Sequence, residues 1–480
     1  MVERDAQRAV DERMAERQLV AALKKRGGKA TLGDLVVATG LPKMQTENVL
    51  RAMLGRYQSH LAVDDQGELL YLFDPALRPR QQDSAWRRFW ARAGTVLWWL
   101  FTLSCKIGIM LVLVGYFVFF IALALAALIA ATASSKDNKR SSSGLGDLLF
   151  VVFRLVVQIF FIMPPRGQGY GRRALPRDPT ARPFYKKVFS FAFGPEAAER
   201  WGLPQQEDPR AFERGLLAAI RLRKGVISAT DLVRYTGWSL ARADEEATRL
   251  LVEYEGEPEV SEEGTLLYRF PGLLVSADGQ QHAEPPPWHR EPETPKQLTG
   301  NATGTNVGIV LMNGFNLFAA ASFLFVPEAQ AAVYQALQLV IPSGVYLVGL
   351  IFALLLFLVP VLRTFGVGAE NRRRQRRNVR RALLGELLRE ADSGKEPSLR
   401  PEGLPGTATR AAGDKPGLAR AETEILLRDL EGEPEADDAS RLIYRFPRLR
   451  SDLDAARDLR KSVGAASTRL GEIVYSSQEA

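Results

Sequence analysis

The stretch that decides the fold occurs twice in the chain. Residues 19–73 read LVAALKKRGGKATLGDLVVATGLPKMQTENVLRAMLGRYQSHLAVDDQGELLYLF, and residues 216–270 repeat this stretch at one fixed offset without a gap. Of the 55 aligned positions 18 are identical, including the pairs Asp34/Asp231 and Gly40/Gly237. Self-similarity over this length predicts one small soluble module that is present in two copies.

Each copy predicts three helices followed by a β-hairpin. The second helix is expected to begin at a hydroxyl that can cap it, Thr31 or Ser228. It is expected to end at Gly40 or Gly237, because glycine accepts a left-handed backbone. The predicted third helices are residues 44–57 and 241–254. Three helices followed by a hairpin is the winged-helix arrangement, a helix-turn-helix with a wing.

A degenerate third copy is indicated near the C-terminus. Residues 431–435 repeat the Gly-Glu-Pro-Glu pattern of 255–259, and residues 442–447 repeat the strand that ends at Pro271. Only the final helix and hairpin of this copy are predicted, as a partial module at 418–450. The preceding stretch, 391–417, is rich in Gly, Pro and Ala and is interpreted as a flexible linker.

Three segments are predicted to span a membrane. Residues 107–133 carry no charge over 27 positions, which is about 40 Å of helix and exceeds a hydrocarbon core of ~30 Å. Residues 306–326 and 343–362 are the second and third predicted spans. The aromatic and basic residues before the first span are typical of an interfacial belt: Trp86, Arg87, Arg88, Trp90, Arg92, Trp98 and Trp99.

A fourth crossing is predicted at 145–163, with Asp147, Arg154 and Gln158 on one helical face. An amphipathic helix lying in the headgroups remains the alternative. We favour four spans over three, because an even number of crossings keeps both copies of the module in the cytoplasm. Arg154 is the one candidate for a functional charge inside the membrane.

A block of arginines follows the third span: Arg372, Arg373, Arg374, Arg376, Arg377, Arg380 and Arg381. Such a cluster resists translocation and attracts anionic lipid, so these residues are predicted to contact the membrane surface. The expected localisation is the cell inner membrane, multi-pass, with a cytoplasmic C-terminus. The charged N-terminus has no apolar core and predicts no cleavable secretory signal.

The expected fold class is an α-helical membrane protein with small α+β, winged-helix-like soluble modules, duplicated, plus a partial third copy. The predicted segments are: 1–16, N-terminal charged helix or tail; 17–80, module 1; 86–133, interfacial helix and first span; 134–187, basic membrane-proximal region; 188–275, module 2; 276–304, Pro-rich linker; 306–362, transmembrane hairpin; 363–390, Arg-rich helix; 391–417, flexible linker; 418–450, partial module 3; 451–480, C-terminal helix and tail.

The charge of the modules argues against DNA binding. In a helix-turn-helix, the third helix faces phosphates and needs Lys and Arg. Along its helix and wing the second copy carries Asp244, Glu245, Glu246, Glu253, Glu255, Glu257, Glu259, Glu262 and Glu263 against Arg242 and Arg249. The first copy, with Lys43, Arg51 and Arg56 against Glu47, is more neutral but has no basic wing. A protein partner is therefore favoured over nucleic acid.

No pattern predicts a reaction. Cys105 is the single cysteine and the three histidines are scattered, which excludes an all-cysteine metal site within one chain. Phosphate-binding loops, an HExxH motif and recognisable nucleophiles are absent from the sequence. Asn313 and Asn316, three apart within a predicted span, are interpreted as forming inter-helix hydrogen bonds, in preference to the alternative of a transport site. No catalytic, cofactor-binding or metal-binding residue is predicted, no cofactor is expected, and the chain is not expected to be an enzyme.

Seven short motifs occur in order along the chain: residues 188–194 (VFSFAFG), 199–201 (ERW), 256–260 (GEPEV), 267–271 (LYRFP), 370–372 (ENR), 455–459 (AARDL) and 473–477 (IVYSS). Together they resemble a family of uncharacterised multi-span membrane proteins of cyanobacteria and chloroplasts. The resemblance covers most of 17–380 and 452–477. It implies a membrane location and no functional residue.

Three functional hypotheses follow. The favoured one is a scaffold or assembly factor that presents its modules at the cytoplasmic membrane face, with anionic lipid and a protein as partners. The alternatives are a membrane-tethered transcription regulator and a transporter or channel subunit. The side of the N-terminal module and the oligomeric state stay open.

Overall fold

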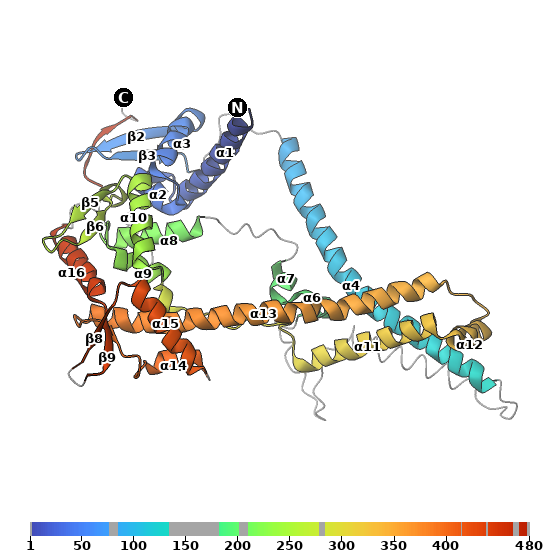
Figure 1. Cartoon of the computed structure of the whole chain (residues 1–480). Coiled ribbons are helices and arrows are strands. Elements are labelled where there is room, and N and C mark those ends of the chain that lie inside the picture. The colour runs from blue at the N-terminus through green and yellow to red at the C-terminus, as the bar shows by residue number, and fades with distance from the viewer. Residues whose placement is uncertain are drawn as a thin grey trace, which may run out of the picture. The chain divides into compact units, whose positions relative to one another are not determined.

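The computed structural model describes residues 2–75, 85–133, 182–200, 210–277, 284–413, 415–437, 440–463 and 470–477. Most of these residues are helical, and the strands form small antiparallel sheets (Figure 1). The chain divides into two units. Unit 1 comprises Met1–Ser84, Gln206–Thr294 and Arg372–Ala480, and unit 2 comprises Ala85–Gln205 and Pro295–Asn371.

Unit 1 begins with the first α+β module, residues 2–75. Its elements are α1 (Val2–Lys25), β1 (Lys29–Thr31), α2 (Leu32–Thr39), α3 (Lys43–Arg56), β2 (Ser59–Asp64) and β3 (Leu69–Phe73). Thr31 and Asp34 form a capping box at the start of α2, and Gly40 ends it with φ 71°. Both features confirm the prediction from the sequence. Leu19, Leu50 and Phe73 pack together in the core of this module.

The second α+β module, residues 210–277, has the same order of elements. They are α8 (Ala211–Leu222), β4 (Val226–Ile227), α9 (Ala229–Thr236), α10 (Leu240–Tyr254), β5 (Glu257–Val260) and β6 (Leu266–Arg269). Ser228 and Asp231 form the capping box of α9, and Gly237 ends this helix with φ 70°. The predicted third helix, 241–254, corresponds to α10 within one residue.

A third α+β module occupies residues 372–446 and is larger than predicted. It takes its first helix from the end of α13 (Ser343–Asp392) and continues through β7 (Ser398–Leu399), α14 (Gly406–Ala412), α15 (Pro416–Asp429), β8 (Glu433–Ala436) and β9 (Leu442–Arg445). The interpretation of 391–417 as a flexible linker is therefore wrong. Leu399, Ala408 and Ala412 are buried in the unit 1 core, so this stretch is part of the packed module. Its Gly and Pro residues lie mostly between the short elements β7, α14 and α15.

The three modules share one strand register. The tyrosine of the returning strand lies opposite the first strand in each: Tyr71 opposite Ala30, Tyr268 opposite Ile227, and Tyr444 opposite Leu399. All three tyrosines are buried, as expected for packing residues. Among the described residues, a fourth strand, β10 (Ile473–Ser476), is present in the first sheet only, which has the order β1-β3-β2-β10. Helix α16 (Pro447–Ser462) packs on α9.

Unit 2 contains α4 (Ala85–Ala133), α6 (Phe184–Phe193), α7 (Pro195–Arg200), α11 (Thr303–Phe325), α12 (Pro327–Leu337) and the first part of α13. Among the described residues, three helical segments are long and apolar enough to cross a membrane: Leu100–Ala126, Thr303–Phe325 and Ser343–Asp392. The three predicted spans fall on these helices. The fourth predicted span, 145–163 with Arg154, lies outside the described residues, so the choice between three and four spans remains a prediction.

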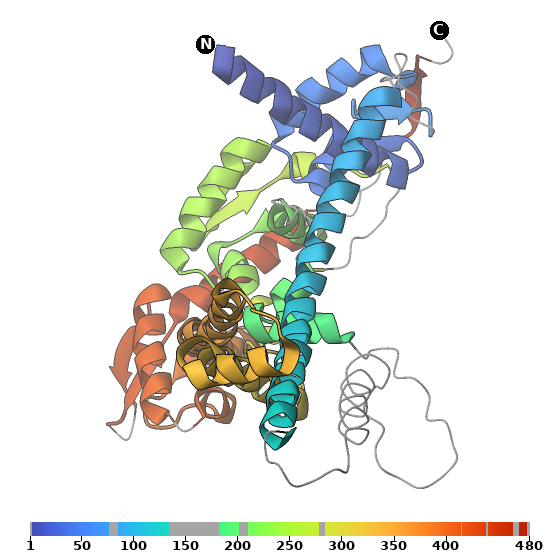
Figure 2. The same cartoon turned by 90° about the vertical axis from the view of Figure 1, so that its right-hand side faces the viewer.

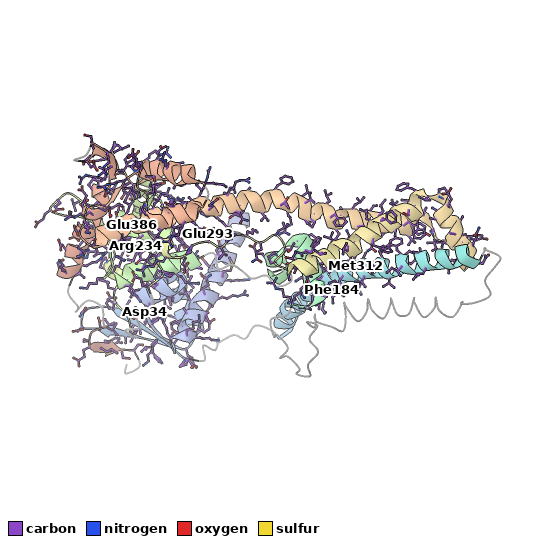
Figure 3. All side chains as sticks on the ribbon, turned by 90° about the horizontal axis from the view of Figure 1, so that it is seen from below. Asp34, Phe184, Arg234, Glu293, Met312 and Glu386 are labelled. Atoms are coloured by element: carbon purple, nitrogen blue, oxygen red, sulfur yellow. The ribbon has the colours of Figure 1, made fainter. Side chains whose placement is uncertain are left out.

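Residues 188–200 belong to unit 2 and not to the second module, where we placed them. Val188 and Phe191 of α6 pack against Met110 of α4 and Met312 of α11. Figure 3 labels Met312 together with Phe184, which packs against the same cluster. Apolar packing on the long helices therefore moves the boundary of the second module to the start of α8.

Two asparagines join the long helices. Asn313 donates its amide to the carbonyl of Ala353 in α13, and Asn316 donates to the carbonyl of Leu113 in α4, both at 2.9 Å. Both side chains are buried. This confirms the interpretation that the pair forms inter-helix hydrogen bonds.

Candidate functional site

The first and second modules meet at Asp34, whose side chain is fully buried. Its carboxylate faces Arg221 of α8 at 2.7 Å and Arg26 of its own module at 3.3 Å. It also accepts a hydrogen bond from the backbone N–H of Ala277 at 2.9 Å. Burial raises the pKa of Asp34, but Arg221, Ala277 and Arg26 together bring it below its usual value. Asp34 is therefore a buried anion held by two modules.

Asp231 occupies the equivalent position in the second module. Its carboxylate faces Arg223, the equivalent of Arg26, at 2.7 Å, and also pairs with Arg460 of α16. Burial opposes the charged form, and Arg460 and Arg223 more than compensate, so the pKa of Asp231 lies below its usual value. Each capping-box aspartate thus binds one arginine of its own module and one from a later element. The sequence repeat placed the two aspartates at equivalent positions, but none of their four arginine partners was predicted.

Further polar contacts join the second module to the third module and α16. Arg234 of α9 forms two hydrogen bonds to the carboxylate of Asp392, at 2.6 and 2.8 Å. Asp452 of α16 accepts from the backbone N–H and the hydroxyl of Thr230, at 3.1 and 2.9 Å. Burial raises the pKa of Asp452 to about 6, although the Thr230 hydrogen bonds and Arg448 act in the opposite direction.

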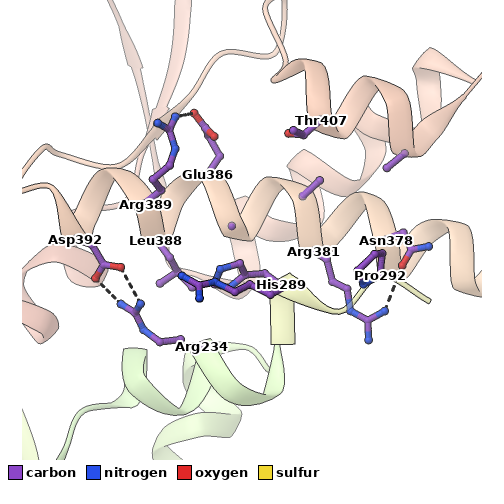
Figure 4. A pocket seen from close by; sticks show the side chains of 14 residues that line it. Arg234, His289, Pro292, Asn378, Arg381, Glu386, Leu388, Arg389, Asp392 and Thr407 are labelled. Atoms are coloured by element: carbon purple, nitrogen blue, oxygen red, sulfur yellow. Dashed lines mark hydrogen bonds and ion pairs between the residues drawn. The ribbon is translucent and has the colours of Figure 1, made fainter. Parts of the chain in front are cut away.

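A cavity of about 610 Å³ lies beside α13 in unit 1 (Figure 4). It is bounded by α9, by the segment around η3 (Trp288–Arg290), by the last turns of α13 and by α14. Its lining residues are Arg234, His289, Arg290, Pro292, Asn378, Arg381, Ala382, Gly385, Glu386, Leu388, Arg389, Asp392, Thr407 and Ala411. The sequence predicted no site here, because the lining comes from segments that are distant in the chain.

The lining of this cavity combines four arginines with apolar side chains such as Leu388 and Ala411. The guanidinium of Arg381 lies 4.5 Å from the ring centre of Trp288. Gly385 lets His289 approach α13, because a Cβ at this position would lie 3.1 Å from His289 Cδ2. Burial lowers the pKa of His289, and Arg234 and Arg290 lower it further, which favours the neutral ring at pH 7. Among the described lining residues, no nucleophile lies beside a base.

The arginines predicted to contact lipid divide into two groups. Arg374, Arg377 and Arg381 face Glu293 at 3.7, 2.6 and 3.0 Å, and Arg380 faces Asp429 at 2.6 Å. Figure 3 labels Glu293 beside α13. Arg372, Arg373 and Arg376 are exposed. Four of the predicted arginines are therefore used in contacts within unit 1, and lipid contact remains a prediction for the block.

The basic residues considered for DNA binding lie in ion pairs or, in the case of Arg242, over an aromatic ring. In the first module, Lys43 faces Glu255 at 2.7 Å, Arg51 faces Glu47 at 2.5 Å, and Arg56 faces Glu16 at 2.8 Å. In the second module, Arg242 lies over Trp238 at 4.6 Å. Arg249 lies within 4 Å of three carboxylates, those of Glu213, Glu246 and Glu253. Little unpaired positive charge is left on either third helix.

Among the described residues, no group of three or more His, Cys, Asp or Glu side chains could hold a metal ion. No family model matches the chain, and no solved structure matches it. An uncharacterised chloroplastic protein of Arabidopsis thaliana is 24% identical over 387 aligned residues, which cover 76% of this chain and 71% of that protein. This similarity is consistent with a family of uncharacterised chloroplast and cyanobacterial proteins.

Proposed function

We propose that the chain is an integral membrane protein that acts as a scaffold or assembly factor, without enzymatic activity of its own. The two winged-helix-like copies and the third module would together form one protein-binding domain at the cytoplasmic face of the inner membrane. The observation that carries this proposal is the set of buried contacts at Asp34 and Asp231, because each aspartate binds arginines from two parts of unit 1.

Exposed apolar side chains on the long helices support a membrane anchor. A water-soluble chain rarely leaves many such side chains in contact with water. On α11 and α13 the exposed large apolar residues are Val307, Val310, Leu311, Phe318, Phe325, Leu347, Val348, Ile351, Leu354, Leu355, Leu358, Val361, Leu362 and Phe365. A bilayer would cover this surface, and the exposed Arg372, Arg373 and Arg376 could then bind anionic lipid.

Exposed apolar residues on the third helices favour a protein partner over DNA. Met44 of α3 is 68% exposed and Val252 of α10 is 80% exposed. The neighbouring arginines are paired with carboxylates or stacked on Trp238. A DNA duplex would therefore meet an acidic surface on the second module and little unpaired positive charge on the first. Apolar side chains surrounded by paired charges are typical of protein interfaces.

Topology mapping tests the membrane part of the proposal. Reporter fusions after residues 75, 140, 220 and 335 of the full chain should place 75 and 220 in the cytoplasm. An external position for either would contradict a cytoplasmic body made of both modules. Extraction of the chain from membranes by alkaline carbonate would contradict the integral anchor.

Photo-crosslinking tests the interaction part. A photoreactive amino acid at Met44 or Val252 should give the same protein adduct in membranes, and one at Glu263 in the exposed wing turn should not. A salt-sensitive complex between the full chain in nanodiscs and duplex DNA would favour the alternative, a membrane-tethered transcription regulator.

A further inference from the structure

The outer edges of the three hairpins differ in how they resist a further strand. Edge strands commonly carry charges and proline, because both discourage pairing with another chain. β5 carries Glu257, Pro258 and Glu259, and β8 repeats the pattern with Glu433, Pro434 and Glu435. Within the described residues, no strand pairs with the outer edge of β5 or β8. These two edges are protected by their sequence.

The outer edge of the first hairpin lacks this protection and is covered. β2 reads SHLAVD, with no proline and with apolar residues at its centre. β10 pairs with it in antiparallel orientation, with Ile473 opposite Asp64 and Ser476 opposite Ala62. Figures 1 and 2 both show the red C-terminal strand beside the blue sheet. The chain therefore supplies its own fourth strand where the edge is open.

Backbone groups and a few small polar groups hold this strand. Ser477 donates its N–H to the carbonyl of Leu61, and the N–H of Leu61 donates to Ser477 Oγ, both at 2.9 Å. At the other end, Gly471 donates its N–H to Asp64 Oδ2 at 2.9 Å. A Cβ on Gly471 would overlap Asp65 Oδ1, so the position requires glycine unless Asp65 moves.

The side chains of β10 contribute little burial. Ile473 is 50% exposed, Val474 is 71% exposed and Tyr475 is 54% exposed. Apolar burial is the main force that holds a strand permanently in a sheet. A short strand attached mostly through its backbone can leave the edge without exposing a core. It is also recognised mostly through its backbone, as in strand addition to an open sheet edge.

We propose that the edge of β2 is a docking surface for an extended peptide, and that residues 470–477 are the resident segment that closes it. The partner peptide would follow the pattern of this segment: a glycine, one further residue, a four-residue strand and a hydroxyl residue at the Ser477 position. Partner binding then requires release of the C-terminal segment. This inference names a partner surface and rests on the proposed scaffold function only for its biological role.

A peptide-binding assay tests the proposal on the chain in nanodiscs. A fluorescent peptide with the sequence of residues 470–480 is titrated into the full chain and into a variant that ends at Arg469. We expect saturable binding to the shortened variant and at least tenfold weaker binding to the full chain. A peptide with Gly471→Val and Ser477→Pro should lose binding, and a matched peptide with Val474→Thr should keep it.

Equal binding to both proteins, or no binding to a shortened variant whose thermal unfolding is cooperative, would overturn the proposal. If the shortened variant fails to fold, hydrogen exchange on the full chain decides. Ser477→Pro should then raise the exchange rate of the Leu61 amide at least tenfold, and an unchanged rate would overturn the proposal. These readouts do not depend on the crosslinked partner, so the docking surface and the scaffold function can fail separately.

Discussion

Two contacts of the first α+β module, both within unit 1, differ in their burial and in the kind of interaction that holds them. At one end, the carboxylate of Asp34 is fully buried and faces arginines of two modules. At the other, β10 attaches to β2 through its backbone while its apolar side chains stay half exposed or more. The difference teaches that a buried charge must keep its partners, whereas an exposed backbone ladder can be exchanged.

The largest expected effect is at the buried junction. Asp231→Ala removes the buried carboxylate that faces both Arg223 and Arg460. Arg223 keeps Glu284 and Arg460 keeps the carbonyl of Val226, but neither replaces a buried charge of opposite sign between the two arginines. Removing one partner of a buried pair costs about 3–5 kcal/mol. Pulse proteolysis of the full chain in urea measures this loss. The matched control, Glu47→Ala at an exposed pair with Arg51, should cost about 1 kcal/mol or less. Equal losses would remove the distinction between buried and exposed contacts.

The pH dependence of Asp452 sharpens the same comparison. The raised pKa of Asp452 means that its carboxyl group binds a proton more tightly in the folded state than in the unfolded state. The free energy of unfolding should therefore fall as pH rises from about 4 to about 6 and this carboxyl group ionises. A difference of roughly two pKa units corresponds to about 3 kcal/mol at most. Asp452→Asn should be more stable than the natural chain at pH 7.5 and similar to it at pH 4. Identical pH profiles of unfolding for the two proteins would contradict this assignment.

Comparing alanine substitutions at two glycines separates the cost of backbone strain from the cost of a steric clash. Gly237 and Gly67 have φ of 70° and 84°, so alanine strains both. A Cβ at Gly237 would lie 2.5 Å from the ring of Trp288, whereas nothing lies within 4 Å of one at Gly67. Gly67→Ala should cost about 1 kcal/mol in unfolding free energy and Gly237→Ala about 2–3 kcal/mol. Equal losses of unfolding free energy in chemical denaturation would show that the contact between Gly237 and Trp288 can accommodate an added methyl group.

The smallest expected effect on global stability is at the exposed edge. Ser477→Ala removes the acceptor of the Leu61 N–H but buries no new group. It should change the unfolding free energy by less than about 1 kcal/mol, while raising hydrogen exchange at Leu61. A loss as large as that of Asp231→Ala would mean that β10 is a permanent part of the fold.

The local structure of the modules was predictable because its determinants are close in sequence. Thr31 lies three residues before Asp34 and Gly40 ends the same helix, so the capping box and the helix end follow from spacing. The third module was missed at its first helix for a physical reason. That helix continues a predicted span, and its arginines resemble a lipid-binding cluster, although Val379, Leu383 and Leu387 are buried in the unit 1 core.

The candidate sites depend on contacts between distant segments, which spacing cannot predict. Asp34 finds Arg221 across 187 positions, and Gly471 finds Asp64 across 407. The repeat offset showed that Asp34 and Asp231 occupy equivalent positions, but it did not reveal their arginine partners. The cavity beside α13 likewise combines Arg234, His289 and Asp392 from three segments.

The most direct test of the central claim is a double-mutant cycle between Asp34 and Arg221 on the full chain in nanodiscs. The single variants Asp34→Ala and Arg221→Ala and the double variant are compared by their unfolding free energies. If this buried pair joins the first and second modules, the coupling energy should be at least about 1.5 kcal/mol. Losses that add to within about 0.3 kcal/mol would show that the two residues act independently and would contradict one body built from joined modules.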